Sequence, residues 1–294
     1  MRIFGKKIDV TNLVIHILFC CLTILMIYPF ISMLSVSLTP EEELIQYGYR
    51  VWPTRPDLGA YKVVLRGFKP VAMALATSLF VCITGTLMCV FVNSTFAYTV
   101  SRRSFPAARI VNFLLLFTMF VGGGTAASYI VNINWLKLKN NLLILIIPGS
   151  IGTMNVIIIR SFFQSLPYGL IESAKLDGAS EFQVYSRIML PLSTPALGTI
   201  AISTFIGKWN EYYAPMMYFD TGKATTLALY LQRTTAIIEM AKQNSNLPAD
   251  FLSNVPGTSI AMATACITIL PMVFVFPYFQ KYFVKGMAIG AIKA

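Results

Sequence analysis

The sequence predicts an all-α membrane protein whose helices cross a bilayer six times. Only 12% of its 294 residues are charged and 56% are hydrophobic, whereas a typical soluble domain has about 25% charged residues. Six apolar stretches are long enough for spanning helices, each of which needs about 20 residues. The alternating apolar and polar pattern of a membrane β-barrel is absent from the sequence.

The six expected spans form one membrane domain that covers residues 1–294. The first stretch, of about 24 residues, exceeds the apolar core of a signal peptide, which is about 7–15 residues, and no A-x-A-like cleavage site follows it. We therefore expect an uncleaved first helix. The spans are residues 13–36, 71–99, 110–131, 142–163, 195–219 and 258–280.

The distribution of charge indicates that the N-terminus lies in the cytoplasm. Arg2, Lys6 and Lys7 precede the first span, whereas three glutamates follow it at 41–43, and basic residues favour the inner side. Six spans then place the basic C-terminal segment 280–294 inside as well. Since the net charge of +11 lies mostly at span ends, it fits lipid headgroups better than nucleic acid.

This topology assigns the longer connections to sides of the membrane. The outer loop 38–70 contains a short helical pattern at 58–65, and residues 220–257 form an extracytoplasmic segment with a helical pattern at 225–243. Residues 164–194 form a cytoplasmic segment between the fourth and fifth spans.

The cytoplasmic segment 164–194 predicts two short helices. Ser165 and Pro167 are typical of a helix start. Gly178 follows the first helix, where a left-handed backbone costs a glycine little. Ser180 and Gln183 have the spacing of a capping box, which predicts the start of the second helix.

The second helix is expected to stop at Pro191 and Pro195, before the fifth span. Apolar Leu170, Ile171, Ala174 and Leu176 alternate with polar residues in the segment. Because the pair is amphipathic and capped, the segment is typical of a docking element rather than a loop.

The same segment carries a spaced motif, which consists of Glu172, Ala174, Gly178, Ile188, Leu190 and Pro191. With three residues before the glycine and nine after it, the motif resembles the EAA signature of bacterial ABC importer permeases. Ser173 replaces the usual alanine, a small change. "LDGAS" around Asp177 is similar to the sugar-uptake branch, and 208–215 and 280–294 resemble the second permease subunit of maltose-type importers.

The resemblance implies a type I ABC importer permease in the bacterial cytoplasmic membrane. Its partners would be a second homologous permease in a heterodimer, two ABC ATPase subunits, an extracytoplasmic solute-binding protein and membrane lipid. ATP and Mg would be bound by the ATPases, and no cofactor by this chain. The residues expected to couple to the ATPase are Glu172, Ser173, Ala174, Asp177, Gly178, Ile188, Leu190 and Pro191.

No phosphate-binding loop of the form G-x-x-x-x-G-K-[ST] occurs in the sequence, so the chain is not expected to be an enzyme. The run Gly122–Gly124 lies within the third expected span and no lysine follows it. Two hypotheses remain for this run. The glycines break the helix where backbone lines a cavity, or they allow close packing between helices.

The fifth span contains a polar cluster, and charged residues within spans are functional candidates. Lys208 and Glu211 have the spacing of a pair on one helix face. Trp209 offers an aromatic face to a sugar, while Asn210 and Glu211 offer hydrogen bonds. The alternative is a polar clamp between the two permease subunits. Weaker candidates for the solute pathway, more typical of contacts between helices, are Asn93 and Asn155.

Other functions were weighed against a carbohydrate importer, for which the resemblance favours an oligosaccharide. One alternative is an importer permease for a different polar solute. An ion-coupled secondary carrier predicts repeated halves and several acidic residues inside spans, but only Glu211 qualifies. A membrane enzyme has almost no support, because the chain has one histidine and no paired carboxylates within spans.

Overall fold

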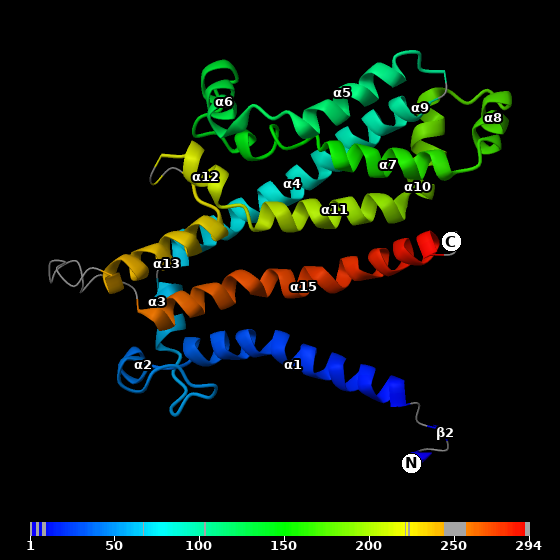
Figure 1. The fold of residues 1–294 in the computed structure, drawn as a ribbon. Coiled ribbons are helices and arrows are strands. Elements are labelled where there is room, and N and C mark those ends of the chain that lie inside the picture. The colour runs from blue at the N-terminus through cyan, green and yellow to red at the C-terminus, as the bar shows by residue number, and fades with distance from the viewer. Residues whose placement is uncertain are drawn as a thin grey trace. The chain divides into compact units, whose positions relative to one another are not determined.

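The computed structural model of the protein is almost entirely helical (Figure 1), as the sequence predicts. One short antiparallel pair joins β1 (Arg2–Ile3) to β2 (Lys6–Lys7). The chain forms two compact units, unit 1 (Met1–Val71 with Leu231–Pro271) and unit 2 (Ala72–Tyr230 with Met272–Ala294). The structure describes residues 2–3, 6–7, 10–66, 68–102, 104–220, 222, 224–243 and 257–291.

Three helices are long and apolar enough to cross a bilayer without a break, among the residues described. They contain the predicted stretches 13–36 and 71–99 and most of 258–280 within their apolar parts. The helices are α1 (Val10–Ser37), α4 (Phe68–Ser101) and α15 (Thr258–Ala291).

The third predicted span, 110–131, is not one continuous helix. It divides into α5 (Ala108–Phe120) and α6 (Gly124–Ile130), and α6 continues as the π-helix η1 (Val131–Trp135) at an angle of 113° to α5. A Cβ atom added at Gly122 or Gly124 would have no atom within 4 Å, and Gly124 has a φ of +72°. Within this chain the glycines therefore break the helix and do not support close packing.

The prediction of one continuous helix over 142–163 is wrong. A 3₁₀ helix, η2 (Leu142–Leu145), is followed by turns, and α7 (Thr153–Ser165) begins only afterwards. Pro148 and Gly149 lie in these turns and disfavour a continuous helix. With 13 residues, α7 is about 20 Å long, shorter than a hydrocarbon core of about 30 Å.

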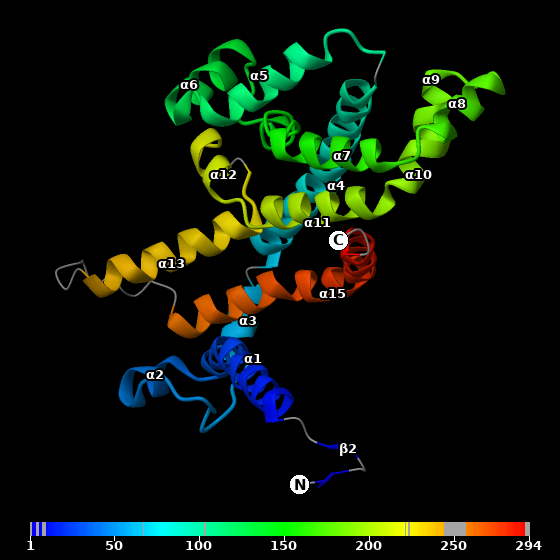
Figure 2. The ribbon, with the colours of Figure 1, turned by 45° about the vertical axis from the view of Figure 1, so that its right-hand side comes forward.

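The fifth predicted span, 195–219, is also broken. Helix α11 (Thr194–Trp209) ends before the polar cluster is complete, and α12 (Tyr213–Tyr218) follows it. Figures 1 and 2 show α7 and α11 side by side in unit 2.

The two predicted helices in the loops are confirmed. Helix α3 (Gly59–Arg66) covers nearly all of the pattern at 58–65, and it follows α2 (Glu41–Tyr47), which the sequence did not predict. Helix α13 (Leu227–Gln243) corresponds to the pattern at 225–243. Residues 244–256 of the predicted extracytoplasmic segment lie outside the described residues.

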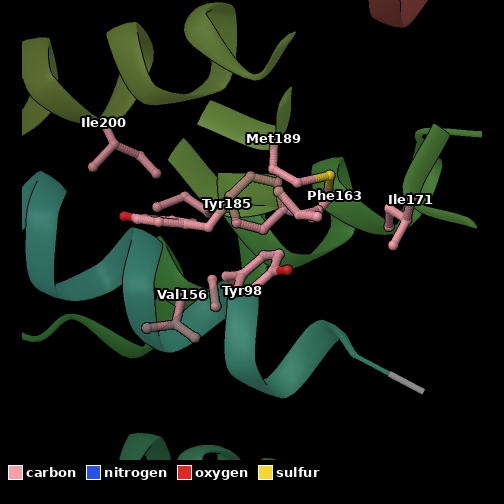
Figure 3. Close-up of a cluster of buried hydrophobic side chains, with 10 residues drawn as sticks. Tyr98, Val156, Phe163, Ile171, Tyr185, Met189 and Ile200 are labelled. Carbon is pink, nitrogen blue, oxygen red and sulfur yellow. The ribbon is translucent and has the colours of Figure 1, made fainter. Parts of the chain in front are cut away.

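A core of buried side chains lies near one end of α4, where α4, α7 and α11 meet three short elements (Figure 3). These elements are α8 (Gly169–Leu176), α9 (Glu181–Val184) and the π-helix η3 (Tyr185–Met189). The core residues are Ala97, Tyr98, Val156, Ile159, Phe163, Ile171, Val184, Tyr185, Met189 and Ile200. The cytoplasmic segment expected from the sequence is thus packed onto the helical bundle.

In unit 1, the Glu41 carboxylate caps the start of α15. It accepts hydrogen bonds from the backbone N–H groups of Thr258 at 2.8 Å and Ser259 at 2.9 Å, and from the Ser259 hydroxyl. Burial raises the pKa of Glu41, but the hydrogen bonds from Ser259 and Thr258 outweigh it and hold the pKa below its ordinary value. The charged form therefore stabilises the folded state.

We predict that Glu41→Ala lowers the free energy of unfolding by about 1 kcal/mol, the usual cost of removing a helix cap. The contribution of Glu41 is present above the pKa of the unfolded chain and is lost as the pH falls through the lower folded pKa. Thermal unfolding of the purified protein between pH 7 and pH 3 measures it. Glu42→Ala, at an exposed neighbour, is the control, and equal losses in both variants would contradict the capping role.

Candidate functional site

The segment between α7 and α11 folds as an elbow, which we define as residues 168–192. Helix α8 ends in a turn at Gly178, whose φ is +83°. The N–H group of Gly178 donates to the Lys175 carbonyl, and that of Ala179 to the Ala174 carbonyl. The left-handed glycine predicted after the first helix is confirmed.

The capping box predicted for the second helix is also confirmed. Helix α9 (Glu181–Val184) begins after Ser180, whose hydroxyl accepts a hydrogen bond from the Gln183 N–H at 3.3 Å. The Gln183 side chain accepts one in return from the Ser180 N–H at 2.8 Å.

The second helix ends at Leu192, between Pro191 and Pro195 and before the fifth span, as predicted. It runs from α9 through η3 into α10 (Leu190–Leu192), and α11 leaves it at an angle of 77°. Proline cannot donate to a carbonyl four residues back. The preceding turn is instead wound as a π-helix, in which the Leu190 N–H donates to the Tyr185 carbonyl. Pro195 lies in the first turn of α11, which tolerates proline.

Glu181 ties the elbow to the end of α4. Its carboxylate accepts a hydrogen bond from the Tyr98 hydroxyl at 2.5 Å and one from Arg102 at 3.2 Å. Lys175 of α8 forms an ion pair with the same carboxylate at 2.6 Å. The Arg102 guanidinium also lies over the Tyr98 ring, 5.5 Å from its centroid. One carboxylate thus connects both short helices and a long one.

These contacts change the acidity of Glu181. Burial raises its pKa, but hydrogen bonds from Lys175 and Tyr98 and the charges of Arg102 and Lys175 lower it further, to about 2. Glu181 is therefore ionised throughout the physiological range, and its ion pairs persist there.

The expected coupling residues divide between two sides of the elbow. Ala174 and Leu190 pack against the buried core, so the small Ala174 side chain allows α8 to approach the bundle. Ile188 is half-buried. The exposed members are Glu172, Ser173, Asp177, Gly178 and Pro191.

The elbow also exposes apolar side chains outside the motif, and two of them are exposed most. Leu176 is 88% exposed and Phe182 is 72% exposed. They lie on short helices outside the three continuous candidate spans, and a large apolar side chain left in contact with water is typical of an interaction surface.

A cavity of about 340 Å³ lies in unit 2 beside the predicted polar cluster. Polar and charged side chains from α6, η1, α11 and α12, and from the break before α12, line it. They include Ser128, Asn132, Lys208, Glu211 and Tyr218. The structure thus places Lys208 and Glu211 in the wall of a cavity large enough for a small solute.

Lys208 and Glu211 do not form the predicted helical pair, because α11 ends at Trp209. Lys208 Nζ donates to the Leu145 carbonyl at 2.7 Å. The Glu211 carboxylate accepts hydrogen bonds from the N–H groups of Tyr213 and Ala214, both at 2.9 Å, at the start of α12.

The other two residues of the cluster do not line the cavity. Trp209 is only 3% exposed, and its ring stacks on Phe205 at 6.2 Å between centroids. The aromatic face expected to meet a sugar is covered in this structure. Asn210 is exposed, and its amide donates to the Ile206 carbonyl within the helix.

Asn93 and Asn155, the weaker candidates for the solute pathway, both form contacts between parts of the helical bundle. Asn93 is fully buried, donates to the Ser150 carbonyl at 2.7 Å and accepts from the Gly152 N–H at 2.9 Å. It thereby closes the turn before α7. Asn155 donates to the Cys89 sulfur at 3.6 Å.

Sequence reasoning missed Asn132 and Tyr218 as cavity residues. The Asn132 amide donates to the Tyr218 hydroxyl at 2.9 Å, and the Tyr218 ring stacks on Tyr129 at 5.7 Å. The one available signal in the sequence was that Asn132 is a polar residue beside an apolar stretch. Its position opposite α12 depends on the helix break at Gly122–Gly124.

The comparison with protein families identifies the chain. Residues 82–289 match the family described as the binding-protein-dependent transport system inner membrane component. The chain belongs to this family. It is therefore a membrane component of an ABC transport system, and its apolar helices agree with a location in the cytoplasmic membrane.

Individual relatives extend along nearly the whole chain. Protein LplC of Bacillus subtilis (strain 168) is 33% identical, over 98% of this chain and 96% of the relative. The polygalacturonan/rhamnogalacturonan transport permease YtcP of the same organism is 32% identical, over 91% and 92%.

A solved bacterial ABC transporter involved in the import of the acidic polysaccharide alginate has a similar fold. The TM-score is 0.81 at 25% sequence identity, over 96% of this chain and all of that one. The chain therefore has the type I importer permease fold expected from its motif.

We predict that Glu181→Gln loosens the elbow and lowers the free energy of unfolding. The expected loss is about 0.5–1 kcal/mol, because the side chain is 50% exposed and water screens its ion pairs. In the wild type the contribution should vanish as the pH falls from about 4.3, the unfolded pKa, towards the folded value. Thermal unfolding against pH tests this, with Glu172→Gln as the control. Parallel pH profiles for wild type and Glu181→Gln would refute it.

We also predict that Asn93→Leu destabilises the protein by about 2 kcal/mol, because the buried Ser150 carbonyl and the half-buried Gly152 N–H group lose their partner. The melting temperature of the purified protein measures this loss. Asn134→Leu, at an exposed asparagine of η1, is the control. An unchanged melting temperature together with impaired uptake would instead make Asn93 a solute contact.

Proposed function

We propose that this chain is the permease subunit of an ATP-driven importer that moves a carbohydrate, an oligosaccharide, across the bacterial cytoplasmic membrane. The observation that carries the proposal is the elbow, a rigidly packed polar projection with the EAA-type spacing in a chain of the importer family. The solutes named for a relative and for the solved structure, polygalacturonan/rhamnogalacturonan and alginate, support a carbohydrate over another polar solute.

The proposal includes six membrane crossings with both termini in the cytoplasm. Three would be the continuous helices, and a fourth the bent pair of α5 with α6 and η1. The fifth would be α11 followed by α12. The sixth would be the broken segment 142–165. Backbone that is not helical at membrane depth is tolerated where it is buried in protein or lines a cavity, which suits the breaks beside the cavity.

The elbow would dock on an ATPase subunit. Glu172 and Asp177 are exposed for contacts with basic groups, and Leu176 and Phe182 for contacts in an apolar groove. Gly178 sets the angle between α8 and α9. Two such ATPases would bind ATP and Mg, while this chain supplies no ATP site.

The cavity beside Lys208 would line the solute pathway. Its volume and its mixture of polar and apolar walls suit one or two sugar units. The other wall of the pathway would come from a second, homologous permease, to which an extracytoplasmic solute-binding protein delivers the solute. Residues 1–294 would act as one permease domain.

The function as a whole is tested by uptake into proteoliposomes that contain the assembled importer. Uptake should require ATP and the binding protein and should survive collapse of the ion gradients. Uptake that continues without ATP but stops when the gradients collapse would instead identify an ion-coupled carrier.

We predict that Leu176→Asp and Glu172→Lys each reduce co-purification of the ATPase with the permease pair by about tenfold, since losing one central contact costs about 1–2 kcal/mol. Both side chains are exposed, so the permease itself should fold normally. Ile45→Asp, which changes an 80% exposed apolar residue of α2, is the control. Full co-purification with both elbow variants would refute the docking role.

A further inference from the structure

The ammonium group of Lys208 is the unusual feature of the cavity wall. An ammonium has three N–H donors, and the structure gives this one a single acceptor, the Leu145 carbonyl. Within the described part of the chain, no carboxylate lies within 4 Å of it. The charge of Lys208 is therefore not neutralised by a direct partner.

The other charged group of the wall is in a different situation. Glu211 directs one carboxylate oxygen to two backbone N–H groups at the start of α12. These donors partly compensate its negative charge and fix its position. The cavity consequently presents a cation with unused donors beside a carboxylate that is already engaged.

The neighbouring helix is shaped to hold the lysine. Gly85 of α4 lies against the Lys208 side chain, and a Cβ atom at this glycine would lie 2.6 Å from Cδ and 3.0 Å from Nζ. Both distances are too short for ordinary contact. The missing side chain at Gly85 thus leaves the space that the end of the Lys208 side chain occupies.

We propose that Lys208 makes the cavity selective for an anionic oligosaccharide by binding a carboxylate of the sugar, such as that of a uronic acid unit. This inference rests on the proposed function and adds the chemical class of the solute. A carboxylate of the sugar would accept hydrogen bonds from the unused N–H donors of Lys208 and would neutralise the positive charge of this ammonium in a partly buried site. A neutral sugar would leave the ammonium group without a charged acceptor in direct contact.

The test measures binding to the purified importer, with its partner permease and ATPases but without the binding protein. The probes are radiolabelled trigalacturonate and its methyl ester, which has the same sugar rings without negative charge. Equilibrium dialysis is carried out with and without ATP. Wild type should bind trigalacturonate about tenfold or more tightly than the ester, the range for a charge-assisted hydrogen bond.

Four variants distinguish an effect of the positive charge of Lys208 from an effect of side-chain packing. Lys208→Met should abolish the preference for trigalacturonate, Lys208→Arg should keep most of it, and Gly85→Ala should weaken it by displacing the lysine. Lys62→Met, which removes an exposed positive charge in α3, should change nothing. Melting temperatures identify any variant that fails to fold, and the comparison of the two probes on wild type does not depend on a variant.

Equal affinity for the two probes, or no binding of trigalacturonate, would overturn the inference. A full preference retained in folded Lys208→Met would do the same. If the importer still shows ATP-dependent uptake of a neutral oligosaccharide, the proposed function stands and only the selectivity for anionic sugars is lost.

Discussion

The need to bond every backbone N–H and carbonyl group in an apolar environment governs the structure of unit 2. An unpartnered backbone group in hydrocarbon costs several kcal/mol, yet three of the predicted spans are broken. Polar side chains supply missing partners at two of these breaks, within 142–163 and within 195–219. Asn93 bonds both sides of the turn before α7, Lys208 bonds the end of η2, and Glu211 bonds the start of α12. Irregular backbone next to the cavity is stable because these three side chains are present.

This constraint changes how polar residues inside apolar stretches should be interpreted. Most of these polar residues form hydrogen bonds with other groups of the same chain. Asn93 has no exposed surface, and Ser94 and Thr95 lie within hydrogen-bonding distance of the Tyr185 hydroxyl. Lys208 differs because one carbonyl uses only part of its capacity for hydrogen bonds. Spare capacity in a cavity wall, rather than polarity in a span, is therefore the better guide to a solute contact.

The elbow was more predictable from sequence than the membrane-embedded part. Gly178 and the Ser180–Gln183 capping box act through neighbours in the chain, so spacing alone predicted them. The broken spans depend on partners far away in sequence, such as Asn93 bonding to the turn before α7. Hydropathy could not locate these breaks, because it measures the composition of a segment and not which distant groups bond to its backbone. Trp209 was misjudged for a different reason. It stacks on Phe205, four residues earlier in α11, and this local pairing is visible in the sequence but was not considered.

The geometry of α11 connects the two parts of the site. The helix begins directly after the elbow and ends beside the cavity, so its 16 residues cover about 24 Å. The elbow is held by the buried core around Tyr185 and Met189 and by the ion pairs of Glu181, not by a flexible linker. Close-packed cores resist gradual deformation. If the elbow docks on an ATPase as proposed, a displacement of the elbow would therefore be transmitted along α11. The far end of this helix would first move Lys208 and the break before α12.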